Sequence, residues 1–158
     1  MNFKSWIQNI QLVLKARFGS GITSREGSRL IQSEFVPLLR QLGFRGTGNK
    51  YRKTVAEDVI WEVYIQPSQV NSVQPGYDFY VNLCVQTNRP SDLDIRTGRL
   101  DKFSNKAGSY IWELSGNLGK DHETLRILRE RFQESGITWL TDTQSKLGFS
   151  RTIDSKKE

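Results

Sequence analysis

The sequence predicts an α+β two-layer sandwich, in which an antiparallel sheet of about four to five strands carries helices packed on one face. Two segments, residues 59–65 and 79–85, alternate apolar with polar residues, which is the pattern of strands with one strongly buried face. Flanking segments repeat apolar residues every three or four positions, as amphipathic helices do. Consecutive strands joined by short loops favour antiparallel pairing.

After an amphipathic helix near the N-terminus, a second helix is predicted over residues 30–42. Thr23 and Glu26 stand three residues apart ahead of it, which is the spacing of a capping box. Pro37 lies inside the helical pattern and lacks a backbone donor, so we expect a kink or a late helix start there. Gly43 is well placed to take the left-handed conformation that ends a helix.

The strands follow in order. We expect a turn over residues 45–49, a short strand at 51–54 and then the two clear strands, with a polar loop over 88–94. The segment 95–103 is ambiguous, and residues 110–114 predict a further strand.

The C-terminal part returns to helical periodicity. Asp121 is expected to cap a third helix that Gly136 ends, and a short final helix includes Trp139. Length and pattern together predict a single α+β domain over residues 1–149, followed by a frayed tail at 150–158 that has little apolar content.

Composition fits a globular protein without a membrane span. The 158 residues are 36% hydrophobic and 25% charged, and the formal net charge is +6. Residues 3–14 hold apolar positions at helical spacing interrupted by polar ones, so we expect an amphipathic helix there rather than an export signal. The single cysteine, Cys84, suits a reducing compartment, and these points together predict a cytoplasmic protein.

Groups for ordinary catalysis are scarce. His122 is the one histidine and Cys84 the one cysteine, which is too few for a typical zinc site. The glycines of residues 43–48 follow a helix and precede a strand, whereas a phosphate cradle needs the opposite order. Three aspartates in residues 92–101 lack calcium-loop spacing. The sequence therefore predicts no enzyme, no cofactor and no metal.

A basic patch is the main candidate binding feature, because no acidic residue lies between Glu34 and Glu57. The patch interleaves with aromatic residues, as in proteins that bind single-stranded nucleic acid by stacking bases and pairing phosphates. Alternatively, the aromatics belong to the core and the charges solvate the surface. The residues concerned are Arg45, Lys50, Arg52 and Lys53, with Tyr51, Trp61 and Tyr64.

Several short motifs occur in a characteristic order. A helix leads to Gly43-Phe44, one strand ends in Gln66-Pro67-Ser68, the next carries Asn82, and an arginine-containing segment follows. This order resembles the bacterial domain-of-unknown-function family 4304 (DUF4304) over roughly residues 30–140. The resemblance implies a cytoplasmic bacterial protein with no established reaction. The polar positions that match the family pattern are Gln66, Ser68, Asn82, Arg96 and Arg99.

Strand periodicity places Gln66 and Asn82 on the same side of their strands as Tyr64 and Tyr80. With the matching arginines, these side chains would gather on one sheet face or edge. There they either bind a partner or satisfy neighbouring loops internally.

Three functional hypotheses follow. The leading one is a non-enzymatic protein-binding module with an acidic partner, in its most concrete form an immunity protein that blocks a bacterial toxin by covering its active site. The second is a single-stranded nucleic-acid-binding protein that uses the basic patch. The third is an enzyme that uses a carboxylate such as Glu62 or Asp78 in a cleft.

Overall fold

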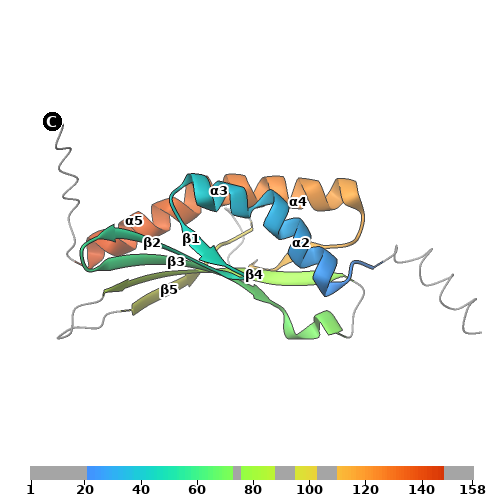
Figure 1. Cartoon of the computed structure of the whole chain (residues 1–158), viewed down its shortest axis with the longest axis horizontal. Coiled ribbons are helices and arrows are strands. Elements are labelled where there is room, and N and C mark those ends of the chain that lie inside the picture. The colour runs from blue at the N-terminus through green and yellow to red at the C-terminus, as the bar shows by residue number, and fades with distance from the viewer. Residues whose placement is uncertain (1–20, 73–75, 88–94, 103–109, 148–158) are drawn as a thin grey trace, which may run out of the picture.

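The computed structural model describes residues 21–72, 76–87, 95–102 and 110–147, which form a helical layer over a sheet (Figure 1). The sheet has six strands: β1 Arg45–Thr47, β2 Lys50–Ala56, β3 Val59–Pro67, β4 Tyr77–Thr87, β5 Ile95–Arg99 and β6 Trp112–Leu114. The helices are α2 Ser24–Glu34, α3 Val36–Gln41, α4 Leu118–Arg131 and α5 Ile137–Lys146, with a 3-10 turn, η1, at Gln69–Ser72.

The predicted α+β class is confirmed, as are the antiparallel pairing and the placement of the described helices on one face of the sheet (Figure 1). None of the described helices is long and apolar enough to cross a membrane. The helix expected over residues 3–14, the loop over 88–94 and the tail from residue 150 lie outside the described residues.

Strand order follows the chain from β1 to β5, with each neighbouring pair antiparallel. β4 is the longest described strand. One of its edges pairs with β3, and the other edge pairs with both β6 and β5. Its first part pairs with β6, where Phe79 lies opposite Trp112, and its second part pairs with β5, where Asn82 lies opposite Arg99. β5 and β6 therefore form one edge of the sheet, which the chain leaves after Leu100.

Alternation in β3 and β4 separates the two faces of the sheet as predicted. Every second residue is buried beneath the helices, and the intervening residues are partly exposed on the other side. The buried set consists of Val59, Trp61, Val63 and Ile65 in β3, and Tyr77, Phe79, Val81, Leu83 and Val85 in β4.

Three predictions for α2 and α3 are confirmed: the capping box, the late helix start at Pro37 and the left-handed conformation of Gly43. The backbone N–H of Glu26 donates to Thr23 Oγ1 over 3.2 Å, and its carboxylate accepts from the Thr23 backbone N–H over 2.9 Å, completing the capping box. The helical run breaks at Phe35, and Pro37 lies in the first turn of α3, where its missing N–H leaves no bond unmade. Gly43 follows with a φ of 89°.

The turn expected over residues 45–49 was wrong, because residues 45–47 form β1 and only the end of the segment turns. Gly46 lies opposite Tyr51 in the β1–β2 hairpin. A side chain at Gly46 would stand 2.1 Å from the carbonyl oxygen of Lys50, so the two strands approach this closely only because the residue is glycine.

Two further expectations about the C-terminal helices were wrong. Asn117, not Asp121, caps α4 by accepting from the backbone N–H of Lys120 over 3.1 Å. Gly136 does not end the helix: α4 passes through a π-helical turn, η2 Phe132–Gly136, directly into α5. Glycine is needed there for contact, since a Cβ would lie 2.9 Å from the Phe132 ring.

Aromatic and polar contacts tie the helical layer to the sheet. The rings of Phe35 and Phe132 meet edge to face at 5.4 Å between centroids, a favoured aromatic geometry. Between β3 and α5, the Trp61 indole N–H donates to Gln144 Oε1 over 3.0 Å, and both side chains are buried. These contacts hold the helices against one face of the sheet.

Candidate functional site

None of the described α-helices covers the second face of the sheet, and the 3-10 turn η1 lies on that side at the connection from β3 to β4 (Figure 1). We call this surface the open face. Strand register places on it the side chains of Lys50, Arg52, Glu62, Tyr64, Gln66, Tyr80, Asn82, Cys84 and Arg99. The prediction that Tyr64, Gln66, Tyr80 and Asn82 share one side of the sheet is confirmed.

Four of these residues form a single row across four strands. Lys50 lies opposite Tyr64, Tyr64 opposite Asn82, and Asn82 opposite Arg99. Three strand spacings of about 4.8 Å separate the Cα atoms of Lys50 and Arg99 by about 14 Å. The row therefore has a cation at each end, with an aromatic ring and an amide between them.

At the β5 end, four side chains form a polar cluster that we call the Arg99 cluster: Gln66, Tyr80, Asn82 and Arg99. Arg99 Nε donates to Asn82 Oδ1 over 3.1 Å, and Asn82 Nδ2 donates to Gln66 Oε1 over 2.9 Å. Arginine has donors only, so it fixes which end of the Asn82 amide faces it. The guanidinium carbon of Arg99 also lies 4.4 Å from the centroid of the Tyr80 ring.

At the β2 end, two cations share one carboxylate. Arg52 Nε lies 2.6 Å from Glu62 Oε2, and Lys50 Nζ lies 3.5 Å from Glu62 Oε1. Lys50 Nζ also stands 5.6 Å from the centroid of the Tyr64 ring. The Glu62 side chain is only 12% exposed beneath its partners, so this end of the open face presents cations and largely hides the acid.

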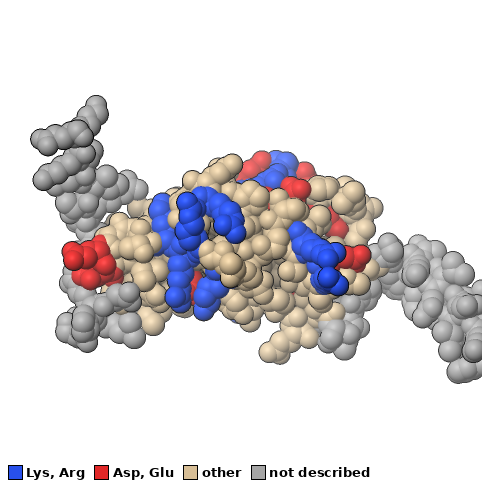
Figure 2. All heavy atoms as spheres, in the orientation of Figure 1, with Lys and Arg blue, Asp and Glu red and all other residues tan. Residues whose placement is uncertain are grey.

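The basic patch lies at the β1–β2 edge of the sheet, where Figure 2 shows a band of lysine and arginine. Arg45 is partly structural, since its Nη1 donates to the carbonyl oxygens of Arg40 and Phe44 near the end of α3. Lys53 lies on the helical side of the sheet, with Nζ 5.6 Å from the centroid of the Trp61 ring. The patch therefore wraps an edge instead of lying on one surface.

The structure separates other residues that the sequence grouped together. Arg96 lies opposite Val85 and so shares the helical side of the sheet, unlike Arg99. The aromatics Tyr51 and Trp61 belong to the core, with 0% and 6% exposure. Ser68 lies just past β3, where its backbone N–H donates to the Asp78 carbonyl over 2.8 Å.

The single cysteine and the single histidine lie on different layers of the fold, Cys84 on β4 and His122 on α4. Cys84 is on the open face opposite Glu62, and burial, followed by the Glu62 charge, raises the pKa of its thiol. His122 is exposed on α4, with Nδ1 3.6 Å from Glu34 Oε1. Among the described residues, no three of His, Cys, Asp and Glu are grouped to hold a metal ion.

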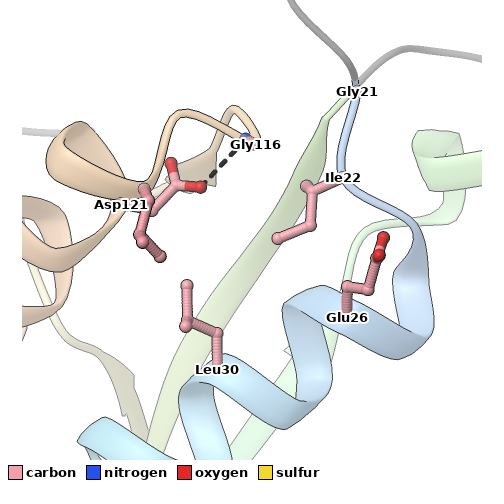
Figure 3. Close-up of a pocket in the computed structure, with 7 residues that line it drawn as sticks. Gly21, Ile22, Glu26, Leu30, Gly116 and Asp121 are labelled. Atoms are coloured by element: carbon pink, nitrogen blue, oxygen red, sulfur yellow. Dashed lines mark hydrogen bonds between the residues drawn. The ribbon is translucent and has the colours of Figure 1, made fainter.

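A hollow of about 290 Å³ lies elsewhere, between the start of α2 and the β6–α4 turn (Figure 3). Ile22 and Leu30 point into it from one side, and Asp121 lines the other side with its carboxylate turned toward Gly116. The Asp121 carboxylate accepts from the backbone N–H groups of Ser115 and Gly116 over 2.7 and 2.9 Å, so it is committed to holding that turn. Sequence reasoning took Asp121 for a cap and did not find this hollow.

Fold and site together define a class: a small α+β two-layer domain whose open face, free of any described α-helix, carries paired cations, tyrosines and amides. Within that class, the chain belongs to the DUF4304 family. The family model described as "Domain of unknown function (DUF4304)" matches residues 35–142, which is more than half of the chain and includes all six strands. The predicted resemblance is thus confirmed. No curated protein and no solved structure matches the chain.

Proposed function

We propose that this protein is a non-enzymatic protein-binding module that uses its open face to contact an acidic surface of a protein partner. The observation that carries the proposal is the pairing of tyrosine with a cation at both ends of one cross-strand row, Arg99 with Tyr80 and Lys50 with Tyr64. Tyrosine and arginine are the residue types that dominate binding energy at protein interfaces.

The side chains of the open face are already held in position, which supports the proposal. The polar groups of the Arg99 cluster are held by one another, and the cations near Glu62 are held by its carboxylate. Side chains already fixed before binding lose less conformational entropy when a partner covers them. A surface of this kind suits a rigid contact with another folded protein.

Charge supports an acidic partner. The chain carries a formal net charge of +6, and its acid-free stretch runs along the β1–β2 edge beside the open face. Complementary charge speeds encounter and disfavours partners of like sign. In its most concrete form, the proposal is an immunity protein that neutralises a toxin by covering the toxin's active site with the open face.

Affinity capture of the tagged chain from the cells that encode it tests this proposal. We expect a stoichiometric complex by gel filtration with light scattering, with any catalytic activity in the partner and inhibition of that activity by added chain. If the chain migrates alone at micromolar concentration in that extract, the proposal is wrong.

Two matched variants then locate the contact surface. Tyr64 is 37% exposed on the open face, and Tyr64→Ala is expected to weaken the complex about tenfold or more, as interface tyrosines commonly do. Leu118 is 63% exposed on α4, and Leu118→Ala is expected to leave affinity within twofold. The reverse pattern would assign the contact to the helical layer and contradict the proposal.

A second candidate, single-stranded nucleic-acid binding, is favoured by one observation. Among the described residues, Arg40, Arg45 and Lys53 make no salt bridge with a carboxylate, so the β1–β2 edge keeps a net positive charge. Gel shifts on single-stranded RNA and DNA at 50 and 200 mM salt test it. Several phosphate contacts predict a loss of affinity of about tenfold or more over that range, and a flat response excludes this function.

A further inference from the structure

We propose that Arg99 anchors a docking site for an acidic segment of the protein partner. Its guanidinium binds a carboxylate side chain of that segment. This inference rests on the proposed function, because it names the chemical group through which the partner engages the open face. Among the described residues, no carboxylate forms a salt bridge with Arg99. The same residue is nonetheless held in place more firmly than an ordinary surface arginine.

Two contacts orient the Arg99 guanidinium. Its Nε–H donates to Asn82 Oδ1, and its central carbon lies over the Tyr80 ring, 4.4 Å from the ring centroid. Arginine has five N–H donors, so the four on the two Nη atoms remain for a ligand in a fixed fork geometry. That fork matches both oxygens of a carboxylate, which makes the planar group a better anchor than a mobile lysine.

Two exposed arginines elsewhere on the surface, Arg52 and Arg126, differ in this respect. Arg52 donates its Nε to Glu62, and Arg126 is bound by Glu123 and Glu130 on its own helix. Their charges are already satisfied by carboxylates of the chain. Arg99 instead has an amide as its side-chain hydrogen-bond partner, and an amide orients the cation without neutralising it.

The cross-strand row extends the site and sets the form of the ligand. Lys50 stands at the far end of the row, about 14 Å from Arg99 by strand spacing. An extended peptide advances about 3.3 Å per residue, so two acidic residues four positions apart span about 13 Å. An extended acidic segment that crosses the strands would therefore reach both cations, with Arg99 as the stronger site because Lys50 is shared with Glu62.

The same geometry disfavours a nucleic-acid ligand at this place. Base stacking needs a free aromatic face. The Tyr80 ring carries Arg99 at 4.4 Å, and the Tyr64 ring carries Lys50 at 5.6 Å. A base on the occupied face of either ring would have to displace a cation, whereas a carboxylate approaches the cations where they stand.

A peptide titration followed by NMR tests the inference on the full chain. The probe is acetyl-Glu-Thr-Thr-Thr-Glu-amide, and its control replaces both glutamates by glutamine. We expect the glutamate peptide alone to shift the Arg99 Nε–Hε and Asn82 side-chain amide resonances saturably. Arg99→Gln should raise the Kd about two- to fivefold, the upper part of the range for one exposed ion pair. The charge-matched variant Arg25→Gln, at an exposed position of α2, should change the Kd less than twofold.

Asn82 is a positioning residue in this scheme, and Asn82→Asp isolates that role. The substitution places a carboxylate where the amide oxygen lies 3.1 Å from Arg99 Nε. We expect the sheet to stay intact by circular dichroism while the peptide ceases to shift Arg99, because the cation is now paired within the chain. If the Asn82→Asp variant binds the peptide with the same Kd as the parent chain, the inference is overturned.

Other outcomes separate this inference from the proposed function. Unchanged Arg99 resonances, or an Arg99→Gln variant with the parent Kd, overturn the inference even if a protein partner is captured. A captured complex that loses affinity in Tyr64→Ala but not in Arg99→Gln keeps the proposed function and rejects the anchor. A thymidine hexanucleotide that shifts Arg99 at lower concentration than the peptide also overturns it, since the recognised anion would be a phosphate.

Discussion

Replacing Gly27 by alanine places a methyl group in the contact between α2 and the first residue of β4. Gly27 is buried in α2, and an added Cβ would lie 2.5 Å from Tyr77 Cγ and 2.8 Å from Tyr77 Cβ. These atoms are close to the Tyr77 backbone, which is paired with Leu114 in the sheet. The ring therefore cannot swing aside without moving β4 or α2.

Two opposing effects decide the sign of this change. Alanine is favoured over glycine inside a helix by up to about 1 kcal/mol. Forcing an extra methyl into a packed core costs about 1–3 kcal/mol. Because the contact at Gly27 is far below van der Waals distance and involves anchored atoms, we expect Gly27→Ala to lower the free energy of unfolding by about 1–2 kcal/mol, net of the helix gain.

Urea unfolding followed by far-ultraviolet circular dichroism measures the change as a lower midpoint with an unchanged slope. The control is Gly119→Ala in α4, where the nearest atom to an added Cβ is Asn117 Oδ1 at 3.6 Å, an ordinary contact. That variant should be as stable as the parent chain or up to about 1 kcal/mol more stable. If Gly27→Ala behaves like Gly119→Ala, the close packing of α2 on Tyr77 is refuted.

Three further predictions concern single side chains. Asp121→Ala removes the acceptor for two backbone N–H groups of the β6–α4 turn and should destabilise the fold by about 2–3 kcal/mol in the same urea assay. Gln144→Leu leaves the buried Trp61 indole N–H unpaired and should cost about 1–3 kcal/mol, whereas a fold of parent stability would contradict that bond. Because burial raises the pKa of the Cys84 thiol, iodoacetamide should alkylate it with a midpoint above about pH 8.5; a lower midpoint would contradict the placement.

Periodicity was sufficient to predict the layers. Alternation in β3 and β4 follows directly from having one covered and one open face, so the sequence predicted strands over residues 59–65 and 79–85 and the residues buried in them. β4 extends two residues further at each end, to the buried residues Tyr77 and Thr87. β1 had no such signal, because three residues that include a glycine show no period. Its pairing depends on how closely Gly46 approaches β2, which is a tertiary contact.

Helix ends were harder to predict for the same reason. Gly136 was read as a stop, but its role is to admit the Phe132 ring, and the chain stays helical through a π turn. Asp121 was read as a cap because it precedes an apolar stripe, yet Asn117 caps the helix and Asp121 turns back to the preceding loop. Local residue preferences do not distinguish these uses of the same side chain.

The candidate site was partly predictable. Alternation placed Tyr64 and Asn82 on one side of the sheet, and the structure agrees. The contact of Arg99 with Asn82 depends on the register of β5 against β4, which no local pattern determines. Arg96 and Arg99 are three positions apart, so in any regular strand they face opposite ways. The sequence pattern did not identify residues 95–99 as a strand, so it did not place the two arginines on opposite sides of the sheet.

The divided edge of the sheet has a practical consequence for engineering. The backbone N–H of Leu100 donates to the Val81 carbonyl over 2.8 Å, and Trp112 lies opposite Phe79, so Leu100 and Trp112 meet β4 two residues apart. β5 and β6 are each aligned on β4 by their own hydrogen-bonded pairing, so the register of one does not depend on the register of the other. Residues engineered into β6 should therefore leave the alignment of β5, and with it the position of Arg99, unchanged.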